Sequence, residues 1–116
     1  MYGKSTGVFN GKVFVRPDAQ KTNAFQQNTN IVSDRGSAIN TKPELEIYAD
    51  DVKCAHGCTV GQFDLDALFY LKSRGIDEKA AKALLVEAFL ADVLSSVSST
   101  ELSTEIMSLY RERHGW

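Results

Sequence analysis

Three residues whose side chains bind metals or act as nucleophiles lie within five positions: Cys54, His56 and Cys58, in the stretch KCAHGC. On an extended strand all three would face the same side, because alternate residues share a face. A zinc site usually has four ligands, with two or more residues between paired cysteines, and the only other histidine here is the distant His114. The pattern alone leaves three interpretations open: small buried residues, a metal or sulfur site, or a nucleophilic thiol.

The nucleophile interpretation is the weakest of the three. Direct neighbours in sequence seldom form a thiol–base pair, and no oriented base or oxyanion signal accompanies Cys54 or Cys58. We therefore expect no enzymatic activity from this stretch.

Composition narrows the class of protein. The 116 residues are 43% hydrophobic and 24% charged, as in a soluble globular domain. The net charge is −2 and the 13 Lys and Arg residues are dispersed, so we expect no nucleic-acid partner. No apolar run approaches the roughly 20 residues of a membrane span. Two cysteines in one short stretch cannot form the disulfide cross-links between distant segments that stabilise small secreted proteins. This favours a reducing, cytoplasmic location.

The chain changes character near Gln62. Before it, GKVFVRP (residues 11–17) and PELEIYA (43–49) alternate at period two, and the turn-forming clusters between them predict short strands. After it, helical spacing begins at Asp64 and stops at Gly75, and Asp77 suits the next N-cap. We predict a β part at residues 1–62 and a helical part at 63–116. A capping box of Ser98 and Glu101 should start the last helix, and one apolar face should carry Ala81, Leu84, Leu85, Ala88 and Phe89.

Two architectures fit the β part. One is an antiparallel sandwich, and the other is a solenoid of parallel rungs whose corners tolerate Asn, Thr and Gln. At about 20 to 30 residues per coil, 62 residues supply two or three rungs. Composition does not choose between them.

Three longer stretches carry a resemblance to a known family: GKVFVRPDAQKTNAFQQNTN, INTKPELEIYADDVKCAHG and DALFYLKSRGI. They are similar to the C-terminal part of SufD, a member of the SufB/SufD family of iron–sulfur cluster assembly proteins. The resemblance runs from about residue 8 to residue 94. The C-x-H-G pattern around His56 favours SufD over SufB, which carries a His-Glu pair in the corresponding region.

The resemblance implies an α+β fold, in which the terminal rungs of a right-handed parallel β-helix precede a small helical domain. It implies a non-enzymatic scaffold that meets a SufB-like subunit through the last rungs and docks a SufC-like ABC-type ATPase through the helices. His56, together with Cys54, would contribute a half-site for a transient iron–sulfur cluster shared with the partner subunit. An alternative is a purely structural interaction module without a direct cluster role.

Two departures from the family qualify the resemblance. Cys58 stands where many SufD sequences carry a small residue such as Ala, so it is either a third ligand or a buried substitution, and we favour substitution. SufD is also several hundred residues long, so we expect this chain to be a fragment. A β-helix cut to a few rungs has unpaired strand edges, from which we expect a homodimer with Leu45–Ala49 in or beside the contact.

Overall fold

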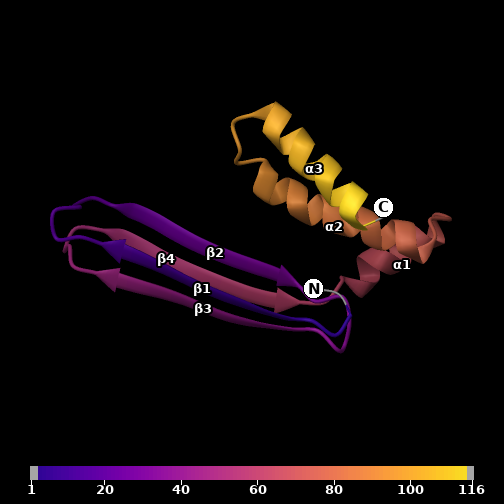
Figure 1. The fold of residues 1–116 in the computed structure, drawn as a ribbon, viewed down its shortest axis with the longest axis horizontal. Coiled ribbons are helices and arrows are strands. Elements are labelled where there is room, and N and C mark those ends of the chain that lie inside the picture. The colour runs from indigo at the N-terminus through magenta and orange to yellow at the C-terminus, as the bar shows by residue number, and fades with distance from the viewer. Residues whose placement is uncertain (1–2, 115–116) are drawn as a thin grey trace. The chain divides into compact units, whose positions relative to one another are not determined.

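The computed structural model describes residues 3–114 and contains four strands followed by three helices. It divides into two compact units, Met1–Gln62 and Phe63–Trp116. The order of elements confirms the α+β class (Figure 1). The strands are β1 (Thr6–Val15), β2 (Asn23–Ile31), β3 (Ala38–Ile47) and β4 (Lys53–Gly61), and the helices are α1 (Leu65–Ser73), α2 (Glu78–Leu94) and α3 (Thr100–His114).

Each strand pairs with the next but one along the chain, and both pairs are parallel. β1 lies beside β3, with Thr6 opposite Ala38, and β2 lies beside β4, with Asn23 opposite Lys53. Neither pairing contains a bulge or an offset. The pairings described for residues 3–114 therefore exclude the antiparallel sandwich.

Side chains alternate along each strand, and one row of each strand faces the other sheet. We call these four rows the inner rows. In β1 the inner row is apolar or small, whereas in β2 it is largely amide. A Cβ atom on Gly11 would overlap the amide of Gln26 and come within 2.7 Å of the Phe9 ring, so this glycine leaves room for both. The inner rows consist of Phe9, Gly11, Val13 and Val15 in β1; Ala24, Gln26, Asn28 and Asn30 in β2; Ile39, Thr41, Pro43 and Leu45 in β3; and Cys54, His56, Cys58 and Val60 in β4.

Pro43 sits inside β3 without breaking the β1–β3 ladder. The N–H groups of Ala38 and Tyr48 donate to the carbonyl oxygens of Ser5 and Val15, each at 2.9 Å. Because alternate N–H groups in a parallel strand point the same way, the even-numbered residues of β3 face β1 and the nitrogen of Pro43 faces the free edge. This is where proline is tolerated in a strand, since no ladder hydrogen bond is lost.

The turns before β2 and β4 lie one above the other. The Lys21 N–H donates to the Asp51 carbonyl oxygen at 2.6 Å, and the Lys53 N–H donates to that of Thr22 at 2.9 Å. Lys21 has a φ of 62°, a left-handed conformation that a non-glycine residue seldom adopts. The Gln20 side-chain oxygen accepts from the Asp51 N–H at 2.9 Å, which adds a further hydrogen bond between the two turns.

The helix boundaries follow the capping residues. Asp77 accepts from the N–H group of Ala80, as the sequence predicts. Asp64, expected as the start of the helical spacing, is the N-cap of α1 and accepts from the N–H groups of Asp66 and Ala67. Gly75 ends the first helix with a φ of 87°. The cap of α3 is Ser99, not Ser98, because the helix begins at Thr100 and the Ser99 hydroxyl accepts from the Leu102 N–H at 3.2 Å.

The predicted apolar face of α2 is partly wrong. Ala81 is fully buried, but Leu84 is 46% exposed and Ala88 is exposed as well, while Val86 is buried in their place. Helical spacing identified the helix but not the side chains that its short neighbours cover. None of the described helices is long and apolar enough to cross a bilayer.

A bidentate ion pair between Arg111 and Glu87 joins α3 to α2. The Nε and Nη2 atoms of Arg111 donate to the two carboxylate oxygens of Glu87, each at 2.7 Å. This contact lowers the pKa of Glu87, chiefly through the hydrogen bonding. A second carboxylate, Glu78 at the start of α2, has a pKa lowered to about 2 by hydrogen bonds from Lys82 and Lys72.

Acid should weaken the contact between α2 and α3. A carboxylate with a lowered folded-state pKa stabilises the fold above its usual pKa of 4.5, and this contribution is lost as the pH falls through the lowered value. We expect Glu87→Gln to reduce the melting temperature at pH 7, measured by circular dichroism at the helix band, and the difference from the parent to shrink as the pH falls below 4.5. Glu105→Gln, at an exposed carboxylate without an ion pair among residues 3–114, should leave the profile unchanged. A constant difference between Glu87→Gln and parent at every pH would contradict the role of this ion pair.

Candidate functional site

Strand β4 brings Cys54, His56 and Cys58 onto one face. In the β2–β4 register they lie beside Ala24, Gln26 and Asn28, the inner row of β2. The side chain of Cys54 is partly buried, and those of His56 and Cys58 are exposed. The sequence pattern had predicted this shared face, and the structure adds that it is the inner face of an edge strand.

The spacing along β4 limits what the three residues can bind together. With a rise of 3.2–3.4 Å per residue, the Cα atoms of Cys54 and His56 are roughly 7 Å apart and those of Cys54 and Cys58 roughly 13 Å apart. Metal–ligand bonds of about 2.0–2.3 Å allow neighbouring side chains to converge, but not both cysteines on one ion. Residues 3–114 contain no group of three or more His, Cys, Asp or Glu side chains that could hold a metal ion, and the side chain of His114 lies outside the described part.

The two cysteines have different surroundings. The Cys58 thiol contacts the Thr41 hydroxyl of the opposite sheet and donates to the Asn28 side-chain oxygen at 3.9 Å. The same Asn28 oxygen accepts from the Asn30 amide at 2.7 Å. Cys54 and His56 make no side-chain hydrogen bond within the described residues. Cys58 is therefore tied into a polar contact between the sheets, whereas Cys54 and His56 are available for a further partner.

The backbone of β4 adds donors to this face. The Lys53 N–H donates to the Thr22 carbonyl oxygen, so the odd-numbered residues of β4 bond to β2. The N–H groups of Cys54, His56 and Cys58 consequently point to the free edge. A ligand at this edge would meet two thiols, an imidazole and a row of main-chain donors, and hydrogen bonds to sulfur are one way in which proteins tune iron–sulfur groups.

Gln26 is a site neighbour that sequence analysis missed. It is the register partner of His56, and its side-chain oxygen is buried without a hydrogen-bond partner among residues 3–114. Such an orphan acceptor costs about 1–3 kcal/mol. The amide-rich β2 gave no sequence signal for this residue, because only the register places it beside His56.

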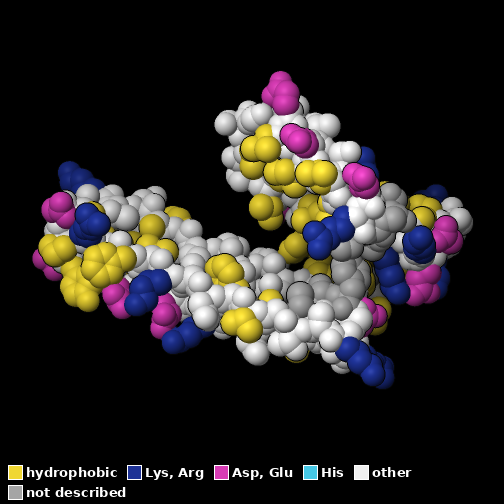
Figure 2. All heavy atoms as spheres, viewed as in Figure 1, with side chains coloured by type: hydrophobic (Ala, Val, Ile, Leu, Met, Phe, Trp, Pro, Cys, Tyr) yellow, Lys and Arg dark blue, Asp and Glu magenta, His cyan; other side chains and the backbone are white. Residues whose placement is uncertain are grey.

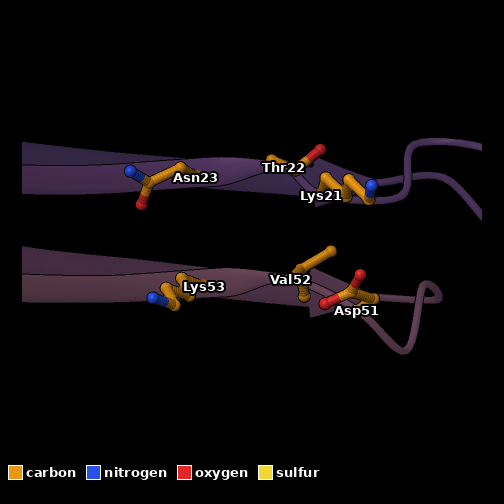
Figure 3. A pocket seen from close by; sticks show the side chains of 6 residues that line it. All are labelled: Lys21, Thr22, Asn23, Asp51, Val52 and Lys53. Atoms are coloured by element: carbon orange, nitrogen blue, oxygen red, sulfur yellow. The ribbon is translucent and has the colours of Figure 1, made fainter.

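A shallow hollow of about 360 Å³ lies at the stacked turns, away from this face. Figure 3 shows Lys21, Thr22, Asn23, Asp51, Val52 and Lys53 around it. None of Cys54, His56 and Cys58 lines this hollow.

Comparison with known proteins gives one consistent result. Residues 1–89 match the family model described as SUF system FeS cluster assembly, SufBD core domain. An iron–sulfur cluster assembly SufBD family protein of Synechocystis is 48% identical over 95 residues, which cover 82% of this chain and 21% of that protein. The iron–sulfur cluster assembly protein SufD of Escherichia coli is 39% identical over 110 residues (95% and 26%), and that of Bacillus subtilis 29% over 113 (97% and 26%).

The chain thus spans about a fifth to a quarter of the length of these relatives. The family match extends over both sheets, α1 and most of α2, and ends at Phe89. The resemblance found in the sequence is confirmed: the chain belongs to the SufBD core family of the SUF system for iron–sulfur cluster assembly.

Proposed function

We propose that this chain is part of a scaffold subunit on which iron–sulfur clusters are assembled, and that Cys54 and His56 form half of a cluster site. The observation that carries the proposal is their position: two unpartnered ligand side chains on the inner face of β4, with the free edge of that strand beside them. The cluster is cargo here, held only until it is passed on.

A half-site explains why the ligand set is incomplete. Two ligands are half of the four protein ligands that usually hold a whole iron–sulfur cluster, so we assign the remaining ligands to another chain. We assign that role to a SufB-like subunit whose strands continue from the free edges of β3 and β4. The pairing of every second strand in parallel supports two terminal coils of a right-handed β-helix.

The competing proposal is an interaction module, in which Cys54 and His56 have only structural roles. Nothing in the chemistry of the face requires catalysis, so both proposals describe a protein that is not an enzyme. They differ in what happens to the cluster when the imidazole is removed.

His56→Ala should impair cluster assembly while leaving the complex intact. The variant is placed in a full-length SufBD-family subunit with this sequence, reconstituted with a SufB-like subunit and a SufC-like ATPase. Iron and acid-labile sulfide per complex should fall by at least about tenfold, because a lost ligand weakens metal binding at least as much as a lost supporting group.

Two matched variants on the same strand sharpen the test. Thr59→Ala changes a side chain on the opposite face of β4 and should leave the cluster content unchanged. Cys58→Ala should also retain the cluster if Cys58 replaces a small residue, and should match His56→Ala if it is a ligand. Normal cluster content in His56→Ala would favour the interaction module.

The helical unit is proposed to dock the SufC-like ATPase through α1. Leu65 and Phe69, one turn apart on this helix, are each 74% exposed, and Tyr70 beside them is 56% exposed. Hydrophobic side chains reach the surface over the helices in Figure 2 as well. Exposed apolar side chains at helical spacing are typical of a partner surface.

Phe69→Glu should weaken association with the ATPase by about tenfold or more, the loss typical of an aromatic anchor at an interface. Binding is measured by titration calorimetry against the isolated ATPase. Leu102→Glu, an equally drastic change at an exposed leucine of α3, is the control and should have little effect. Equal losses in both variants would argue against α1 as the docking surface.

Self-association through Leu45–Ala49 is a further proposal. Ile47 is 42% exposed, and Tyr48 packs its ring against Phe14 with centroids 5.1 Å apart, so this end of β3 presents apolar surface. Size-exclusion chromatography with light scattering should show a dimer at micromolar concentration, and Ile47→Lys should shift it to monomer. A parent chain that is monomeric, with the edge-facing amides of Leu45 and Ile47 unprotected in hydrogen exchange, would overturn the proposal.

A further inference from the structure

Gln26 and His56 each have an unmet hydrogen-bonding group, and the register puts them side by side. The Gln26 side-chain oxygen is buried and has no hydrogen-bond partner among residues 3–114. The His56 side chain is exposed, and neither of its ring nitrogens makes a hydrogen bond within the same residues. Parallel register places their Cα atoms opposite each other on strands about 4.8 Å apart, with both side chains on the inner face.

We propose that Gln26 is the positioning residue of the half-site: its carbonyl oxygen accepts a hydrogen bond from one ring N–H of His56. The proposal rests on the role of His56 proposed above. A neutral imidazole has one N–H and one bare nitrogen, so fixing the N–H on the side of Gln26 leaves the other nitrogen bare. Because β2 lies on one side of β4 and the free edge on the other, the bare nitrogen is turned to the edge where a partner supplies the remaining ligands.

The surroundings of Gln26 keep its amide in place for this role. The side-chain nitrogen of Gln26 would overlap a Cβ atom of residue 11, so the absence of a side chain at Gly11 leaves room for the amide. The next amide along β2, Asn28, is already engaged by Cys58 and Asn30. Among the inner-row amides of β2 that the structure describes, the buried acceptor without a hydrogen bond is thus the one beside His56. Metal-binding histidines are commonly held in this way by an acceptor on the second nitrogen.

The test uses the 116-residue chain without iron, with ¹⁵N-labelled histidine in a His114→Gln background so that a single imidazole remains. Long-range ¹H–¹⁵N spectra at pH about 9, where an ordinary imidazole is neutral, report which nitrogen carries the proton. We expect one dominant tautomer, with a ring N–H that exchanges with water about tenfold more slowly than in Gln26→Leu, the equilibrium change that one net hydrogen bond supplies. Gln26→Leu should also shift the tautomer ratio toward that of a short histidine peptide.

Two further variants separate positioning from general damage to the fold. Gln26→Glu retains an acceptor and should restore the slow exchange, whereas Gln27→Leu, on the opposite face of the same strand, should match the parent. The proposal is overturned if Gln26→Leu leaves the His56 nitrogen shifts and exchange unchanged, as it would if a buried water and not His56 satisfied Gln26. It is also overturned if Gln27→Leu reproduces the effect of Gln26→Leu, because that would indicate general damage to the fold. Because no cluster is present, this result stands apart from the fate of His56→Ala in the complex: either proposal can fail while the other holds.

Discussion

Everything in the β unit depends on parallel pairing without offset. Because β1 pairs with β3 and β2 with β4 residue for residue, each inner-row side chain lies beside one particular residue of the partner strand. A slip by one residue would turn Cys54, His56 and Cys58 to the outer face and place Lys53 inside. The register therefore defines the site as much as the ligand residues do. The hydrogen bonds between the turns, from Lys21 to Asp51 and from Lys53 to Thr22, hold it at one end.

The sequence predicted the helices better than the strands, for physical reasons. Asp64, Asp77 and Gly75 act on their own local backbone, so their roles are visible without the rest of the fold. β2 was not identified as a strand because Gln26, Asn28 and Asn30 occupy its inner row, and an amide row has no apolar alternation to detect. The exposure of Leu84 could not be predicted, since it depends on which neighbour covers that turn of α2. At the site, alternation was enough to put Cys54, His56 and Cys58 on one face, but Gln26 became visible only through the pairing of strands.

Cys54 and His56 lie on a strand with a free edge, and this determines which groups a partner could contact there. The side chains of Cys54 and His56 lie on the inner face of β4, and the main-chain N–H groups of the same residues point to its free edge. An incomplete ligand set binds weakly alone and strongly only when a partner closes it. If the proposed half-site is correct, this would be a physical basis for holding a cluster while the subunits are together and releasing it afterwards.

The polar inner rows also set how the β unit responds to temperature. Among its described residues, the buried hydrophobic side chains are Val15, Val32 and Ala49, all small. Exposing apolar surface raises the heat capacity on unfolding, whereas exposing amide surface lowers it, and ordinary domains average about 12–15 cal/mol/K per residue. A unit in which one of the four inner rows is largely amide should fall below this average. The free energy of unfolding of this unit should therefore vary less with temperature, on cooling and on moderate warming, than that of a domain with a large hydrophobic core.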